Sequence, residues 1–117
     1  MISKFAPHRF YGLAMSGIRR ENLPGKYLAR FPNFPLPVAR LARLAVDLKH
    51  QGQGLAEPLL ADALQRCLHL SESIGMLGVI VDAKDAWARG WYERHEFERL
   101  PDARLTLWLP TAAIARM

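Results

Sequence analysis

Residues 44–56 read Leu44-Ala45-Val46-Asp47-Leu48-Lys49-His50-Gln51-Gly52-Gln53-Gly54-Leu55-Ala56. The apolar residues 44–46 end a candidate strand, and an amphipathic segment follows Gly54. A glycine-bearing turn between a strand and a helix aims several backbone N–H groups at one point, at the positive end of the helix dipole. Gly52 and Gly54 let a phosphate approach the backbone where a Cβ would obstruct it. The stretch therefore predicts either an anion site or a tight turn that only caps the helix.

The turn fits neither of two common phosphate loops. A Walker loop ends in Gly-Lys-Ser/Thr, whereas Leu55 and Ala56 follow Gly54 here. The dinucleotide fingerprint needs a third small residue where this chain has Glu57. The sequence therefore argues against both of these nucleotide sites.

Hydrophobic periodicity predicts the elements that precede the turn. We expect a strand over residues 9–16, a short helix over 22–30, an extended connector over 31–37 and a strand over 38–46. Three prolines exclude the connector from a helix interior or a central strand. The spacing over 38–46 is ambiguous between helix and strand, and the preceding proline and the ending Leu-Ala-Val-Asp favour a strand.

Downstream of the turn, a helix over residues 55–73 has an apolar face with i, i+3, i+4 spacing. A continuous apolar run over 76–81 predicts a strand that is buried on both faces. We expect a second helix over 82–95 with Asp85 as its N-cap, and then strands over 97–100 and 103–109. This order predicts a single α/β or α+β domain over residues 1–117, with a mixed sheet.

The composition excludes several classes of protein. The chain has 117 residues, half of them hydrophobic, so it can bury a core without disulfides or a bound metal. Cys67 is the only cysteine and is expected in the core, and the four histidines share no ligand spacing, so we expect no metal site. No apolar run has the length of a membrane span or the pattern of a signal peptide. We therefore expect a cytoplasmic protein with no membrane contact.

The net charge of +5 is unevenly distributed. Residues 1–46 hold eight basic residues against Glu21 alone and carry a net charge of +7, whereas residues 47–117 carry −2. A basic N-terminal segment of this kind attracts polyanions such as RNA. Arginines scattered over a solvated surface are the alternative explanation.

Two motifs resemble those of the GNAT superfamily of N-acetyltransferases. Gln51-x-x-Gly54-x-Ala56 is similar to the family's Q/R-x-x-G-x-G/A loop, and Asp85-x-x-Ala88-x-x-Trp91-Tyr92-x-x-x-x-Phe97 is similar to its Asn-x-x-Ala-x-x-Phe-Tyr-x-x-x-Gly-Phe helix. The match covers roughly residues 37–109, which are expected to form the cofactor-binding half. It implies a mixed, mostly antiparallel sheet flanked by helices, and acetyl-coenzyme A (acetyl-CoA) as co-substrate. Because only 50 residues precede Gln51, it also implies a sheet without the family's N-terminal strand and helices.

The resemblance implies a role for each matched residue. Backbone groups of Leu44, Ala45 and Val46 would bind the pantetheine arm of the cofactor. The turn and the helix start would hold its pyrophosphate through Gln51, Gly52, Gln53, Gly54, Leu55 and Ala56. Asp85, in place of the family's Asn, would reach the cofactor, with helix capping as the alternative. Tyr92 would protonate the departing CoA thiolate, a task that suits a phenol with a pKa of about 10, and a packed aromatic is the alternative.

A narrower resemblance is to the acetyltransferase toxins of bacterial toxin–antitoxin pairs, which acetylate the α-amine of aminoacyl-tRNA. It rests on residues 37–47, on Ala83-Lys84-Asp85 and on residues 105–110. The strand over 38–46 carries no carboxylate that could act as a base. An α-amine, with a pKa of ~7.7–8.0, needs a base less than a lysine at ~10.4 does. Among primary amines, aminoacyl-tRNA is therefore the predicted acceptor.

The resemblance also implies partner chains. A sheet that lacks the family's first strand has an unpaired edge, which would favour a homodimer or a bound segment of a ribbon-helix-helix antitoxin. The alternative function is a catalytically silent module that binds CoA, RNA or an antitoxin.

Overall fold

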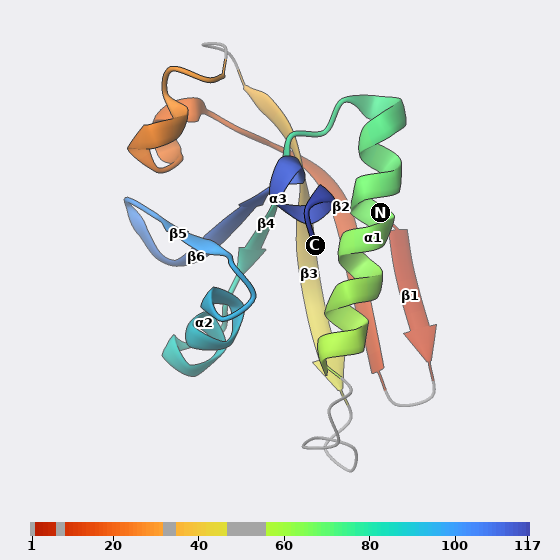
Figure 1. Ribbon diagram of the computed structural model, residues 1–117. Coiled ribbons are helices and arrows are strands. Elements are labelled where there is room, and N and C mark those ends of the chain that lie inside the picture. The colour runs from red at the N-terminus through yellow and green to blue at the C-terminus, as the bar shows by residue number, and fades with distance from the viewer. Residues whose placement is uncertain (1, 7–8, 32–34, 47–55) are drawn as a thin grey trace.

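The computed structural model describes residues 2–6, 9–31, 35–46 and 56–117. Within these ranges the chain forms a six-stranded sheet in the order β1-β2-β3-β4-β6-β5 (Figure 1). The strands are β1 (Ile2–Ala6), β2 (Arg9–Ile18), β3 (Leu36–Val46), β4 (Gly78–Asp82), β5 (Glu98–Leu100) and β6 (Ala103–Pro110). The helices are α1 (Ala56–Ile74), α2 (Ala86–Glu93) and α3 (Thr111–Ala115). Among these strands only β3 and β4 pair in parallel, so the predicted mixed, mostly antiparallel sheet with flanking helices is confirmed.

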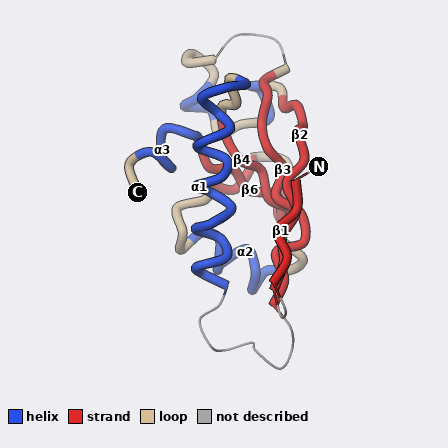
Figure 2. Tube along the Cα trace, turned by 90° about the vertical axis from the view of Figure 1, so that its right-hand side faces the viewer, coloured by secondary structure: helices blue, strands red, loops and turns tan. Residues whose placement is uncertain are grey.

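The two faces of the sheet have separate hydrophobic cores. One face packs against α1, α2 and α3, and its core includes Leu41, Val81, Leu107 and Tyr92. Figure 2 shows α1 and α3 on the same side of the strands. The other face packs against residues 20–31, with a core formed by Leu23, Tyr27, Leu36, Val38, Ile80, Leu100 and Trp108. A residue's place in the alternation of its strand therefore decides which face it joins.

The long helix α1 confirms the predicted amphipathic pattern. Its buried residues are Leu59, Leu60, Ala63, Leu64 and Cys67, which recur at helical spacing on the side that meets the sheet. The helix ends before Gly75, which has a φ of 66° and donates its N–H to the carbonyl of Ser71 at 3.1 Å. Glycine takes this left-handed conformation without the cost that a Cβ would add.

The parallel pairing of β3 and β4 is short. It joins Ala39 to Val79, Arg40 to Ile80 and Leu41 to Val81. Beyond Leu41, β3 continues along β2 as far as Val46, whereas β4 ends at Asp82 and stays paired with β6. The two backbones therefore diverge beyond Leu41 (Figure 1), and this stretch, where the edge of β3 has no pairing with β4, is called the opening below.

Two of the predicted elements before β3 were wrong. Residues 22–30 form no helix but two short 3-10 turns, Arg20–Asn22 and Gly25–Tyr27, joined through Pro24. Burial of Leu23 and Tyr27 against the sheet fixes this irregular path. The prediction also excluded Pro37 from a central strand, but Pro37 lies inside β3. Proline is tolerated there because the pairing of β3 with β4 begins only at Ala39. Residues 32–34 of the predicted connector lie outside the described residues.

The strands and helices after residue 55 agree better with the ranges predicted from the sequence. Strands β4, β5 and β6 confirm the predicted ranges within two residues, and the first four residues of β4 are buried as expected. Helix α2 is shorter than the predicted 82–95, because Asp82 belongs to β4 and Asp85 caps the helix. The sequence did not predict β1 or α3. Among the described residues, no helix is both long and apolar enough to cross a membrane.

Candidate active site

The opening between β3 and β4 presents backbone groups on one side. Leu44, Ala45 and Val46 lie on β3 beyond its last pair with β4, and Ala45 and Val46 still pair with Phe10 and Arg9 on the β2 side. In the part of the chain that the structure describes, no strand pairs with the opposite edge of β3 at these residues. Backbone N–H and C=O groups on such an edge can bind an extended chain of amides. The edge fits the amide-bearing pantetheine arm that is predicted to bind there.

The predicted pyrophosphate loop is only partly described. Gln51, Gly52, Gln53, Gly54 and Leu55 lie outside the described residues, whereas Ala56 is the first residue of α1. The end of β3, the start of α1 and the helix α2 lie toward the same end of the molecule (Figures 1 and 2). The N-terminus of the 19-residue α1 thus lies beside the opening, where the helix dipole favours an anion.

Asp85 acts as the N-cap of α2. Its carboxylate accepts a hydrogen bond of 2.8 Å from the backbone N–H of Ala88. This bond satisfies one of the free N–H groups of the first helical turn. The capping role considered for Asp85 is therefore confirmed, and its contact with a cofactor stays a prediction.

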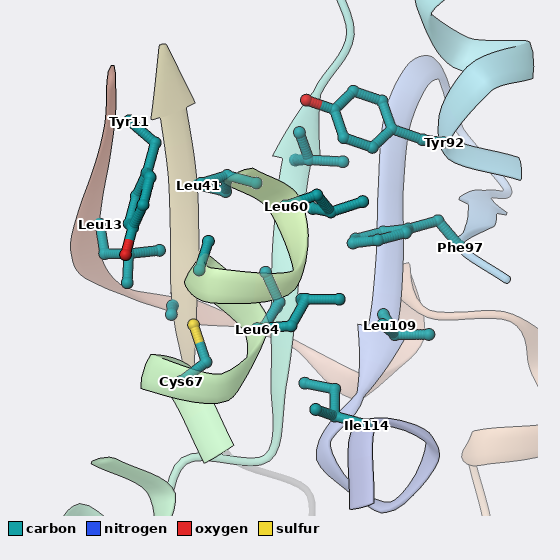
Figure 3. Packing of buried hydrophobic residues seen from close by; sticks show 14 of the residues in the cluster. Tyr11, Leu13, Leu41, Leu60, Leu64, Cys67, Tyr92, Phe97, Leu109 and Ile114 are labelled. Atoms are coloured by element: carbon teal, nitrogen blue, oxygen red, sulfur yellow. The ribbon is translucent and has the colours of Figure 1, made fainter. Parts of the chain in front are cut away.

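Tyr92 lies on the inner side of α2 and is only 7% exposed. Its ring packs edge-on against Trp91, with centroids 5.1 Å apart, and against Phe97 at 5.4 Å. In Figure 3 its hydroxyl points away from α2, toward the side of the sheet where Leu41 lies. Leu41 is the last residue of β3 that pairs with β4, so the hydroxyl faces the start of the opening. Tyr92 is thus both a packed aromatic and a group directed at the predicted site.

Burial of Tyr92 raises the pKa of its phenol to about 12. The phenol therefore stays protonated at every pH near neutrality, and it is a hydrogen-bond donor rather than a base. The same burial makes it a weaker acid than a free tyrosine. Its chemistry suits stabilisation of a nearby anion through a donated hydrogen bond, with proton transfer following as negative charge develops.

Sequence reasoning missed a polar cluster on the opposite face of the sheet. Arg40 on β3 forms an ion pair with Oδ2 of Asp82 at the end of β4, and the Thr106 hydroxyl on β6 donates a hydrogen bond of 2.9 Å to Oδ1. The strand alternation contained a signal, because Arg40 follows Val38 and Asp82 follows Ile80 on that face. The parallel register that brings Arg40 and Asp82 together was not visible in the sequence.

Two negative predictions concern Cys67 and metals. Cys67 is fully buried within the α1 side of the core, and burial raises the pKa of its thiol to about 11. It is therefore a core thiol and not a nucleophile, as expected. The described ranges hold no group of three or more His, Cys, Asp or Glu side chains that could bind a metal.

Comparisons with known proteins agree with this geometry. The family model for the acetyltransferase (GNAT) domain matches residues 31–110. A tRNA-acetylating toxin of Mycobacterium tuberculosis is 41% identical over 100 residues, which cover 86% of this chain and 60% of the relative. A probable toxin, TacT, of Sinorhizobium fredii is 27% identical over 90% of this chain and 62% of its own length. The chain thus spans about three fifths of the length of the curated relatives that it matches.

Solved structures show the same fold. A crystal structure of a KacT mutant superposes with a TM-score of 0.87 at 30% identity, over 93% of this chain and 65% of KacT. AtaT in complex with acetyl-methionyl-tRNAfMet superposes with a TM-score of 0.86 at 31% identity and the same coverage. Since the family model covers most of the chain and includes both sides of the opening, this chain belongs to the GNAT acetyltransferase family.

Proposed function

We propose that the chain is an acetyl-CoA-dependent N-acetyltransferase of the toxin type, whose acceptor is the α-amine of aminoacyl-tRNA. The observation that carries the proposal is the hydroxyl of Tyr92, which faces the start of the opening between β3 and β4. The relative that is 41% identical is named for tRNA acetylation, which supports the choice of acceptor.

The residues around the opening fit acetyl-CoA. We propose that the backbone of residues 44–46 binds the pantetheine arm and that residues 51–56, at the start of α1, hold the pyrophosphate. Bound acetyl-CoA supplies the acetyl group as an activated thioester. This arrangement would bring the thioester to the inner end of the opening, near Tyr92.

Tyr92 is the proposed catalytic residue. Its buried phenol donates a hydrogen bond to the sulfur atom as the carbon–sulfur bond breaks, and so stabilises the leaving thiolate. The proton can follow along this hydrogen bond. A phenol with a raised pKa remains protonated at the start of every turnover, which keeps the donor available.

The basic N-terminal segment is the proposed contact with RNA phosphates. Several of its described cations already have carboxylate neighbours: Arg19 and Arg20 lie by Glu21, and Lys26 lies by Glu98. Exposed ion pairs of this kind contribute only ~0–1 kcal/mol, so phosphate groups can compete for the cations. RNA binding through this segment would therefore depend strongly on salt.

Partner chains form part of the proposal. A mutant of AtaT has been solved with the C-terminus of the antitoxin AtaR and acetyl-CoA, and a complex named KacTA has been solved with DNA. We propose that this chain likewise binds a ribbon-helix-helix antitoxin and that it forms a homodimer. Size-exclusion chromatography with light scattering tests the dimer, because a monomeric mass at every concentration would contradict it.

Incubation of the protein with acetyl-CoA and methionyl-tRNA tests the proposed activity. Mass spectrometry of the released amino acid should show N-acetylmethionine, and a lysine-bearing peptide should be acetylated much more slowly. A silent CoA-binding module would instead be stabilised by CoA in a thermal-shift experiment and yield no acetylated product.

A further inference from the structure

Asp82 lies at the edge of the opening between β3 and β4, where the pairing of the two strands ends. It is the last residue of β4 and comes directly after Val81, which forms the final pair with β3. Its side chain is 54% exposed and accessible to a ligand from solvent. Arg40 contacts one carboxylate oxygen and Thr106 the other. A carboxylate has about four lone-pair positions, so each oxygen keeps capacity to accept another hydrogen bond.

Asp82 and Tyr92 lie on opposite faces of the sheet. Val81 and Tyr92 belong to the core that packs against α1, and Ile80 belongs to the core on the other face. Because side chains alternate along a strand, Asp82 projects on the face of Ile80. A thioester held in the opening would therefore have the phenol of Tyr92 on one side and the carboxylate of Asp82 on the other.

We propose that Asp82 is a second catalytic residue, which receives the proton that the acceptor amine releases during attack. The inference rests on the proposed acetyl transfer and deepens it, because it assigns the face from which the amine approaches. Strand β3 carries no carboxylate, and Asp82 supplies one from the neighbouring strand.

The proposed step balances in atoms and charge. The amine nitrogen forms a bond to the thioester carbonyl carbon, and the carbon–sulfur bond breaks. The nitrogen loses one proton to a carboxylate oxygen of Asp82, and the sulfur receives one proton from the hydroxyl of Tyr92, so the products are the amide and the CoA thiol. Water then returns both side chains to their starting protonation states.

Arg40 and Thr106 are positioning residues in this proposal. They hold the carboxylate from β3 and from β6, so Asp82 keeps its orientation where the β3–β4 pairing ends. The positive charge of Arg40 and the hydroxyl of Thr106 are the groups that contact Asp82 from the neighbouring strands. Lys84, two residues further along the chain, is exposed.

Kinetics with acetyl-CoA and methionyl-tRNA test the role of Asp82. Asp82→Asn keeps the shape and the hydrogen bond from Thr106 but cannot take a proton, so kcat/KM should fall about a hundredfold. Asp82→His should recover part of this loss, with a rise in rate centred near the imidazole pKa of ~6.5. Asp102→Asn, the same change at an exposed turn, should have no effect. An Asp82→Asn protein with the kcat/KM of the wild type would overturn the assignment. An Asp82→His protein whose kcat/KM equals that of Asp82→Asn at every pH would overturn it as well.

A binding experiment separates this role from the proposed activity. The probes are two conjugates in which methionine is linked covalently to CoA. In the first, the methionine nitrogen is a secondary amine, which is protonated at neutral pH, and in the second it is part of a neutral amide. The wild type should bind the amine conjugate about tenfold more tightly than the amide, and Asp82→Asn should lose this preference. Equal preference in both proteins would overturn the role of Asp82 even where the wild type acetylates tRNA. If the wild type transfers no acetyl group, the proposed function fails, and the conjugates still decide whether Asp82 contacts the amine.

Discussion

The hydroxyl of Tyr11 on β2 donates a hydrogen bond of 2.5 Å to Oδ2 of Asp62 on α1. Tyr11 is 1% exposed, and the guanidinium of Arg66, one turn further along α1, lies 6.0 Å from the centre of its ring. Burial and this hydrogen bond to a carboxylate raise the pKa of Tyr11. The contact fixes α1, whose N-terminus borders the proposed cofactor site, against the sheet.

Tyr11→Phe should lower the free energy of unfolding by about 1–3 kcal/mol, because the partly buried carboxylate of Asp62 loses its donor. Urea denaturation measures the change. Tyr27→Phe is a matched control, since Tyr27 is also buried and its hydroxyl lies 3.3 Å from Oε1 of Glu98. A smaller loss is expected at Tyr27, and equal losses would contradict the importance of the Tyr11 contact.

Gly78→Ala should be strongly destabilising. A Cβ at Gly78 would lie 2.1 Å from Cζ3 of the fully buried Trp108, so the ring must move in a packed core. Overpacking of this kind typically costs about 1–3 kcal/mol. Gly90→Ala in α2 is the control, because no atom lies within 4 Å of the added Cβ and alanine favours a helix. A melting temperature that falls for Gly78→Ala and not for Gly90→Ala would agree with the structure, and a Gly78→Ala protein of unchanged stability would not.

Tyr92 should make stability depend on pH in the alkaline range. The pKa of its phenol is about 12 in the folded chain and 10.0 in the unfolded chain. As the pH rises, the unfolded state therefore loses the proton first. The stabilising effect is therefore complete below pH 10.0 and is lost as pH rises toward about 12. At ~1.36 kcal/mol per pKa unit, the full loss is about 2–3 kcal/mol. Urea titrations of wild type and Tyr92→Phe should diverge in slope above about pH 10, and parallel curves would contradict the burial of a protonated phenol.

Cys67 should resist alkylation while the protein is folded. The thiol is fully buried and burial raises its pKa to about 11, so the reactive thiolate is scarce and inaccessible. Iodoacetamide should modify it rapidly in urea and very slowly in native buffer at neutral pH, as followed by mass spectrometry. Rapid modification of the native protein would show that the α1 side of the core opens easily.

The sequence predicted elements whose signals are local. The apolar face of α1 follows helical spacing, β4 is a continuous apolar run, and Asp85 lies directly before the helix that it caps. The helix predicted over residues 22–30 was wrong because the packing of Leu23 and Tyr27 against Trp108 and its neighbours overrides local preference there. Strand β1 depends on its pairing with β2, which no local pattern revealed.

In the candidate site, too, residues with a local sequence signal could be predicted, and contacts between distant residues could not. Tyr92 could be identified from a motif within one helix, whereas the contact between Arg40 and Asp82 joins residues 42 positions apart. That contact depends on the parallel register of β3 and β4, and this register emerges only when both strands join one sheet. The sequence therefore predicted Tyr92 as the proton donor and did not reveal that Arg40 and Thr106 contact the carboxylate of Asp82 on the opposite face.

The rate of acetyl transfer by Tyr92→Phe tests the central claim most directly. Single-turnover reactions with acetyl-CoA and methionyl-tRNA, analysed by mass spectrometry, should show N-acetylmethionine with the wild type and a rate about a hundredfold lower with Tyr92→Phe. The affinity for CoA, measured by calorimetry, should be the same for both proteins, because the ring still packs against Trp91 and Phe97. A Tyr92→Phe protein that transfers acetyl at the wild-type rate would contradict the account.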